Sequence, residues 1–141
     1  MIGQKQVLEI LEKIKEINPT SFLKKLDETC VGMNFILFYL SSHESEVYAS
    51  TIAEKMHISR ARVAVLVQKL INKKFIKKMP STEDRRIEVL KITPLGISET
   101  DTIREQMMSK MSKVIEQVGI GNIYKYIEIG SKIKEILNTI E

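Results

Sequence analysis

The most constraining feature of the sequence is a pair of helical patterns joined by a turn of two residues. Residues 51–56 predict a short helix, His57 and Ile58 the turn, and Ser59 the N-cap of a helix over residues 60–73. The second helical pattern has one apolar stripe, because four of its aliphatic residues recur at the spacing i, i+3, i+4 and i+7. These residues are Val63, Leu66, Val67 and Leu70. Such a stripe packs one face of a helix and leaves the opposite face available for another role.

The face opposite the stripe has a composition suited to the major groove of DNA. At about 100° per residue, Ala61, Val65, Gln68 and Asn72 project away from the stripe. Small side chains let a helix seat deeply and touch thymine methyl groups, while arginine and glutamine can make paired hydrogen bonds to base edges. We therefore expect this helix to contact DNA through Ser59, Arg60, Arg62, Ala64, Val65, Gln68 and Lys69.

A hairpin with a basic tip directly follows the second helix. Ile76–Met79 and Ile87–Ile92 predict two short strands, and the polar loop between them, residues 80–86, ends in two arginines. Thr93 then caps a new helix that has Pro94 in its first position. A helix pair followed by such a hairpin is a winged helix-turn-helix, and an arginine at the wing tip can enter the narrow minor groove.

Positive charge is concentrated in the same part of the chain. Residues 55–91 contain eleven Lys and Arg against three acids, a net charge of +8, whereas the whole chain carries +4. A basic block flanked by acidic arms favours a polyanion as partner, although a solvated lysine-rich face would have the same charge. The lysines expected to meet phosphates are Lys73, Lys77, Lys78 and their neighbours.

Helical patterns also occupy both ends of the chain. An amphipathic helix is predicted over residues 4–17, a second from about residue 20 to 29, and an apolar central helix over residues 33–42. A long helix over residues 94–118, an interruption at residues 119–122 and a last helix complete the chain. An isolated helix of about 14 residues is marginal in water, so the apolar stripes of these arms need a partner surface.

Several short motifs occur together between residues 47 and 96. They are Ile52-Ala53, Ile58-Ser59, the stripe from Val63 to Leu70, Asp84-Arg85-Arg86 and Ile92-Thr93-Pro94-Leu95-Gly96. In this combination the chain resembles the MarR family (multiple antibiotic resistance regulators), and the Asp-Arg-Arg wing with its Thr-x-x-Gly close is the most specific part. The resemblance implies that Asp84 braces the wing by pairing with Arg86, and that Arg86 or Arg85 reaches the minor groove. It also implies a two-fold homodimer, which supplies the symmetry for a palindromic site.

A few positions depart from the family's pattern. Lys74 stands where the family often has a helix-ending glycine, so a strained or longer turn is expected there. Val65 and Ile71 stand where polar or charged side chains are common, and base preference therefore cannot be carried over. Tyr48 replaces a frequent capping threonine.

The expected fold is mainly α, with a winged helix-turn-helix, a small β wing, and terminal helices that form a dimerisation domain. The expected division is residues 1–32 and 97–141 for the dimerisation helices and residues 33–96 for the DNA-binding region. The expected function is a ligand-responsive repressor that binds double-stranded DNA at palindromic operators, with a small-molecule effector and no cofactor. The sequence does not give the operator, the effector, the regulated genes, or the choice between repression and activation.

Other classes of protein fit the sequence less well. A winged-helix module that binds an acidic protein partner is the alternative, and an enzyme comes third because no catalytic constellation is visible. No apolar run approaches the roughly 18 residues of a membrane span, and the N-terminus does not have the pattern of a secretory signal. A single cysteine fits a reduced, cytoplasmic protein.

Some single residues invite other interpretations. Cys30, His43 and His57 lack the local spacing of a metal site, and Cys30 fits a buried inert thiol better than a redox sensor. The pair Gly119-x-Gly121 predicts a turn and not a phosphate loop, because no strand precedes it and no lysine follows at the required spacing. The aromatic residues expected in the core, and not in a ligand site, are Phe35, Phe38 and Tyr39.

Overall fold

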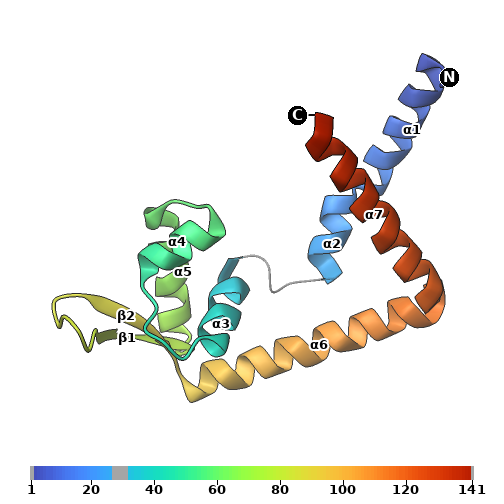
Figure 1. Ribbon diagram of the computed structural model, residues 1–141. Helices are drawn as coiled ribbons and strands as arrows, with labels where there is room; N and C mark the ends of the chain where they lie inside the picture. The colour runs from blue at the N-terminus through green and yellow to red at the C-terminus, as the bar shows by residue number, and fades with distance from the viewer. Residues whose placement is uncertain (1, 27–31, 141) are drawn as a thin grey trace. The chain divides into compact units, whose positions relative to one another are not determined.

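The structure, a computed structural model, describes residues 2–26 and 32–140, and it is mainly helical with a small antiparallel sheet (Figure 1). This architecture confirms the expected fold class. The chain divides between residues 104 and 105 into two compact units, each described by itself below. The elements in chain order are α1 (Gln4–Ile17), α2 (Pro19–Leu26), α3 (Gly32–Ser42), α4 (Ala49–Met56), α5 (Arg60–Asn72), β1 (Ile76–Pro80), β2 (Glu88–Ile92), α6 (Pro94–Val118) and α7 (Ile120–Ile140).

The core of the first unit is built by α3, α4, α5, the sheet and the first part of α6. Val63, Val67 and Leu70 of the predicted α5 stripe are buried, whereas Leu66 is only half-buried. The prediction of a buried central helix is confirmed for α3, which buries three aliphatic side chains. The buried apolar residues are Ile36, Leu37, Leu40, Val47, Ile52, Ala53, Val63, Val67, Leu70, Ile76, Val89, Leu90 and Ile103.

Local capping fixes where the central helices begin. The Ser59 hydroxyl accepts a hydrogen bond of 3.2 Å from the Arg62 backbone N–H, as expected of an N-cap. The Thr93 hydroxyl accepts a bond of 3.0 Å from the Gly96 N–H and donates to the Lys74 carbonyl at 2.6 Å. Gly96 is buried so tightly that a Cβ atom there would overlap the carbonyl oxygen of Phe75. The Thr-x-x-Gly motif therefore joins the start of α6 to the segment that follows α5.

The end of α5 shows the strain expected at Lys74. This residue has a φ of +62°, in the left-handed region where a side chain is unfavourable. The Lys74 N–H bonds the Ile71 carbonyl at 2.8 Å and the Phe75 N–H bonds the Leu70 carbonyl at 3.0 Å. These two bonds form a Schellman motif, in which glycine is the usual left-handed residue.

The wing sheet pairs β1 with β2 in antiparallel register from Ile76 opposite Ile92 to Pro80 opposite Glu88. The predicted boundaries were wrong by one residue at two strand ends, since β1 includes Pro80 and β2 begins at Glu88 instead of Ile87. Ile87 belongs to the loop, where its carbonyl accepts a bond of 2.7 Å from the Ser81 N–H. The sequence did not predict the bridge between Val47 and Leu90, which extends the sheet.

The terminal helices expose their apolar residues. The described structure contains no buried residue in α1 or α7. Gly119, with a φ of +87°, separates α6 from α7, so the break is shorter than the predicted interruption at residues 119–122. The expected end of the second helix near Thr29 lies outside the described residues. Within the described chain, no helix combines the length and apolar character that crossing a membrane requires.

Candidate nucleic-acid interface

The outward face of α5 is free of core contacts, as its sequence pattern predicts. The expected DNA-contacting residues of this helix and its cap are all exposed in the chain, and Val65 keeps 55% of its surface accessible. The helix has no Asp or Glu between Arg60 and Asn72, so nothing on it would repel a phosphate. These exposed residues are Ser59, Arg60, Arg62, Ala64, Val65, Gln68 and Lys69.

A hydrogen bond orients one of these side chains. The Gln68 amide nitrogen donates to the Asn72 side-chain oxygen at 2.9 Å, one helical turn further along α5. This bond leaves the Gln68 carbonyl oxygen and a second amide N–H available to a ligand. Sequence spacing placed both residues on the outward face but did not predict their pairing.

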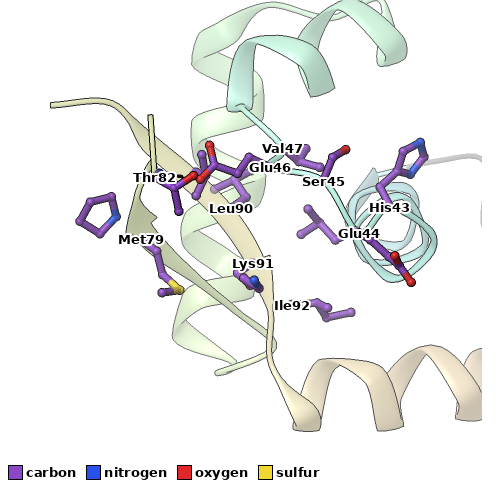
Figure 2. Close-up of a pocket in the computed structure, with 13 residues that line it drawn as sticks. His43, Glu44, Ser45, Glu46, Val47, Met79, Thr82, Leu90, Lys91 and Ile92 are labelled. Carbon is purple, nitrogen blue, oxygen red and sulfur yellow. Dashed lines mark hydrogen bonds between the residues drawn. The ribbon is translucent and has the colours of Figure 1, made fainter. Parts of the chain in front are cut away.

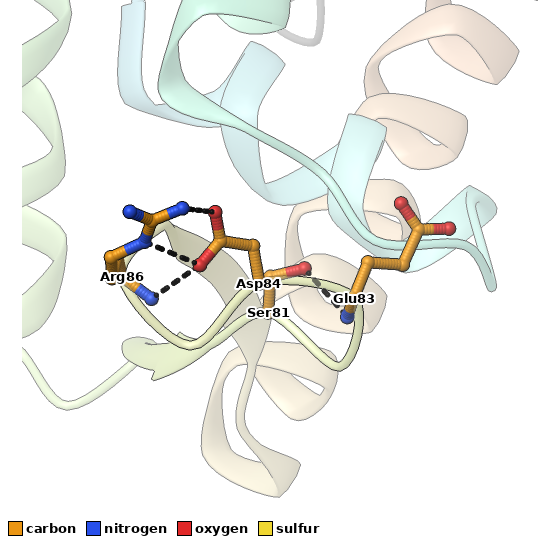
Figure 3. A network of polar contacts seen from close by, with 4 residues as sticks. All are labelled: Ser81, Glu83, Asp84 and Arg86. Carbon is orange, nitrogen blue, oxygen red and sulfur yellow. Dashed lines mark hydrogen bonds and ion pairs between the residues drawn. The ribbon is translucent and has the colours of Figure 1, made fainter.

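The wing tip holds a braced arginine (Figure 3). Arg86 donates to the Asp84 carboxylate from Nε at 3.1 Å, from Nη2 at 3.0 Å and from its backbone N–H at 3.0 Å. These hydrogen bonds lower the pKa of Asp84 and raise the pKa of Arg86. The Arg86 side chain is still 90% exposed, and its Nη1 group has no partner in the described structure. The pairing inferred from the resemblance is therefore present, while Arg85 lies exposed beside it.

A carboxylate that the sequence did not single out anchors the base of this loop. Glu46, in the linker between α3 and α4, accepts bonds of 2.6 Å from the Ser81 hydroxyl and 2.6 Å from the Thr82 N–H. The Ser81 and then the Thr82 hydrogen bonds lower the pKa of Glu46 from 4.5 to about 2. Ser81 is buried, and its hydroxyl also accepts a bond from the Glu83 N–H (Figure 3). No local pattern marks this contact, because its partners are 35 residues apart.

The lysines near the wing differ in their surroundings. Lys78 lies 3.6 Å from the Glu88 carboxylate, so its charge is partly compensated. Lys77 lies directly opposite Lys91 in the sheet, and neither has an ion pair in the described part of the chain. Lys73 places its ammonium 6.0 Å from the centre of the Phe75 ring. Lys77 is therefore the predicted wing lysine whose charge is least compensated, and Lys91 of the basic block lies opposite it.

A hollow of about 340 Å³ lies between the linker after α3 and the wing (Figure 2). Leu40, Val47 and Leu90 contribute apolar surface, and Glu44 and Lys91 contribute opposite charges. This volume lies at the small end of the range for sites that bind small molecules. The lining residues are Leu40, His43, Glu44, Ser45, Glu46, Val47, Met79, Pro80, Thr82, Val89, Leu90, Lys91 and Ile92.

The structure also bears on the other residues that the sequence singled out. Among the described residues there is no group of three or more His, Cys, Asp and Glu that could hold a metal, and Cys30 lies outside them. Gly119 forms a turn between two helices. Phe35, Phe38 and Tyr39 are half-buried and not fully in the core, and the Tyr39 ring stacks on His43 at 3.9 Å between centroids.

Comparison with known proteins finds a family whose model matches part of the chain. Residues 35–87, which run from α3 to the end of the wing loop, match the model of the MarR family. The middle of the chain is similar to the MarR family. This match agrees with the resemblance noted in the sequence, and the matched segment contains the helix pair and wing described above.

Individual relatives agree with this match. The chain is 23% identical over 136 residues to YdgJ, an HTH-type transcriptional regulator of Bacillus subtilis, and the match covers 94% of this chain and 82% of YdgJ. The crystal structure of YusO from Bacillus subtilis has a TM-score of 0.68 at 17% identity, covering 95% of this chain and 99% of YusO. Staphylococcus aureus MarR, solved in complex with salicylate and kanamycin, has a TM-score of 0.67 at 19% identity, covering 96% and 95% of the two chains. These two structures share the fold of the chain.

Proposed function

We propose that this chain is a MarR-type transcriptional regulator that binds double-stranded DNA, with α5 in the major groove and the wing tip in the minor groove. The observation that carries the proposal is the braced Arg86, whose guanidinium is held by Asp84 and yet remains 90% exposed. An arginine held in this way can enter a narrow minor groove with little further loss of conformational freedom. The acid-free outward face of α5 supports the same proposal.

The division of work between the proposed contacts follows from their chemistry. Lys73 and Lys77 provide charge to the phosphates, which fixes position but not sequence. Lys78 contributes less, because Glu88 lies 3.6 Å away. Sequence is read by the outward face of α5 and by Arg86, with Arg85 as a neighbouring cation and Asp84 as the brace.

The exposed apolar stripes of the terminal helices are proposed to be covered by a second copy of the chain. Ile133, Ile136, Leu137 and Ile140 recur at helical spacing on α7, and each is about half exposed or more. A similar exposed stripe on α1 includes Leu11. A homodimer would bury both stripes and present two winged helices to a palindromic operator. Residues 1–32 and 97–141 then serve dimerisation, and residues 33–96 bind DNA.

Ligand-responsive repression completes the proposal. A relative of similar fold was solved with salicylate and kanamycin, which supports a small-molecule effector for this chain as well. Fragments of genomic DNA retained by the purified protein, with and without small aromatic acids, would identify the operator and test for an effector. Release of the retained fragments is the expected response to an effector.

Salt dependence tests the DNA-binding proposal. The logarithm of affinity should fall steeply with the logarithm of salt between about 50 and 200 mM, because bound phosphates release counterions. Lys77→Ala should lower that slope by about two in a dimer, one for each subunit. Lys5→Ala, on α1, is the control and should leave the slope unchanged. Salt-insensitive binding would contradict the phosphate contacts, and tight capture of an acidic protein that competitor DNA cannot displace would favour the alternative module.

Sedimentation tests the dimer. Ile133→Asp with Leu137→Asp places charges in the proposed interface, and a buried unpaired charge costs several kcal/mol. Deletion of residues 1–17 removes the stripe of α1, and both variants should yield monomers. Ser131→Asp with Asn138→Asp, on the opposite face of α7, is the matched control and should remain dimeric. A folded, unchanged dimer in the stripe variants would disprove the proposed interface.

A further inference from the structure

Helix α5 has a second stripe that the core does not use. Ala61, Ala64, Val65 and Gln68 repeat the spacing i, i+3, i+4 and i+7 of the buried stripe, on a different side of the helix. All four are exposed, and Val65 leaves 55% of its surface accessible in the middle of this face. The second stripe is therefore apolar over its first three members and ends in an amide.

The amide at the end of the second stripe is already oriented. Because Gln68 Nε2 donates to Asn72 at 2.9 Å, its carbonyl oxygen and its second N–H point to other partners. One acceptor beside one donor complements the N6 amino group and N7 of adenine in the major groove. Holding the amide in advance reduces the rotamer freedom that binding would otherwise remove.

The apolar part of the stripe complements a different group on DNA. In the major groove, thymine is distinguished from cytosine by its C5-methyl group and its O4 acceptor. Val65 is flanked by the short side chains of Ala61 and Ala64, so a methyl group can approach it without obstruction. A G·C pair has no methyl group, so Val65 would contact polar atoms of the bases there and binding would be weaker.

We infer that this protein reads A·T pairs in each half of its operator, with Gln68 on an adenine edge and Val65 on a thymine methyl group. The inference rests on the proposed function, because it requires α5 to lie in the major groove. The inference adds that each half-site contains A·T pairs. It also gives Asn72 the role of orienting the Gln68 amide. Arg60 and Arg62 lie beside the second stripe, and we expect them to contact the base pairs next to these A·T pairs.

Base analogues test the two contacts separately. The probe is a duplex that the purified protein selects from a pool of random sequences, and its half-sites should contain A·T pairs. Replacing one thymine at a time by deoxyuridine removes only the methyl group, and at one position per half-site affinity should fall about fourfold, or about 15-fold when both half-sites are changed. Val65→Ala should reduce this penalty substantially. Leu95→Ala on α6, where the leucine is 53% exposed, is the matched control and should keep the penalty.

The adenine contact is tested with 7-deazaadenine, which lacks the N7 acceptor. Affinity should fall about fivefold or more at one adenine per half-site, and Gln68→Ala should abolish that penalty. Asn72→Ala should reduce the penalty without removing it, because Gln68 is still present but is no longer oriented. An unchanged penalty in Asn72→Ala would overturn the orienting role of Asn72.

The outcomes separate the inference from the proposed function. If selected duplexes bind with a steep salt dependence but contain G·C pairs throughout the half-sites, the inference is wrong and DNA binding stands. The same conclusion follows if deoxyuridine is tolerated at every position. If no duplex is retained with a salt-dependent affinity, the proposed function itself fails.

Discussion

The Ser81 hydroxyl donates a 2.6 Å hydrogen bond to the Glu46 carboxylate and thereby ties the linker after α3 to the end of β1. The Thr82 N–H donates to the same carboxylate at 2.6 Å, so one ionised group holds two consecutive residues of the wing loop. Ser81 is 2% exposed, and its hydroxyl would be left buried without its acceptor if Glu46 were lost. The attachment of the wing loop to this linker is therefore strongest while Glu46 is charged.

This contact should make stability depend on acid pH. Hydrogen bonds from Ser81 and then Thr82 lower the pKa of Glu46 from 4.5 to about 2, so the stabilisation is complete above pH 4.5 and is lost as the pH falls towards 2. The free energy of unfolding, measured by urea titration over this range, should decline less steeply in Glu46→Gln. Glu44→Gln, two residues away in the same linker, should follow the unchanged protein. If the free energy of unfolding fell equally with pH in the native protein and in Glu46→Gln, Glu46 would not be the source of the pH dependence.

The cross-strand pair of Lys77 and Lys91 predicts a conflict between stability and binding. Like charges directly opposite in a sheet destabilise it, and neither lysine has an ion pair within the described residues. Lys77→Glu should raise the free energy of unfolding by about 0.2–1 kcal/mol, because it places opposite charges there. The same variant should weaken binding to all DNA sequences. Lys78→Glu, which loses its ion pair with Glu88, should not be stabilised; equal gains in both variants would contradict the pairwise explanation.

The left-handed residue after α5 is a place where glycine should improve stability. Lys74 has a φ of +62°, which costs a residue with a side chain about 1–2 kcal/mol. Part of that gain is offset by the greater freedom of glycine in the unfolded chain, so Lys74→Gly should stabilise by about 0.5–1 kcal/mol. Lys73→Gly is the control: Lys73 has a φ of −79°, and the change should be neutral or destabilising. Thermal and urea unfolding of the two variants would measure the difference.

The braced arginine should sense the DNA that flanks the operator. Arg86→Ala should lower affinity roughly tenfold where the flanks are A/T-rich, and less where they are G/C-rich, because A-tracts narrow the minor groove. Asp84→Ala should give a weaker version of the same pattern, since the guanidinium keeps its charge but loses its brace. A binding matrix of both variants against operators with altered flanks provides the test. An equal loss on every flank would make Arg86 a phosphate contact only.

The features that could be predicted from the sequence are those with a local cause. Ser59 and Thr93 could be predicted as caps because each is a hydroxyl residue directly before a helical pattern, and each accepts a bond from the backbone N–H three residues later. The α5 stripe was recognised because its period is that of a helix. The contacts of Glu46 and Val47 were missed because each joins the linker to the wing, more than 30 residues away, and leaves no periodic trace.

The candidate site shows the same limit. Spacing placed Ala61, Val65 and Gln68 on one face of a helix, and the family resemblance supplied the pairing of Asp84 with Arg86. The bond from Gln68 to Asn72 depends on side-chain rotamers, which spacing alone does not determine. The difference between Lys77 and Lys78 depends on strand register, which decides which lysine lies near an acid.

The closed base of the wing suggests how related regulators could exchange target preference. The Thr93 N–H bonds the Phe75 carbonyl at 2.9 Å, and Ile76 pairs with Ile92 just beyond it, so the two ends of the hairpin are fastened independently of its tip. Residues 83–87 could therefore vary in length and charge without moving α5 or α6. Ser81 and Thr82 would have to stay, because they carry the attachment to Glu46. The residues of the wing tip can therefore be replaced, in related proteins or by design, while the rest of the protein is retained.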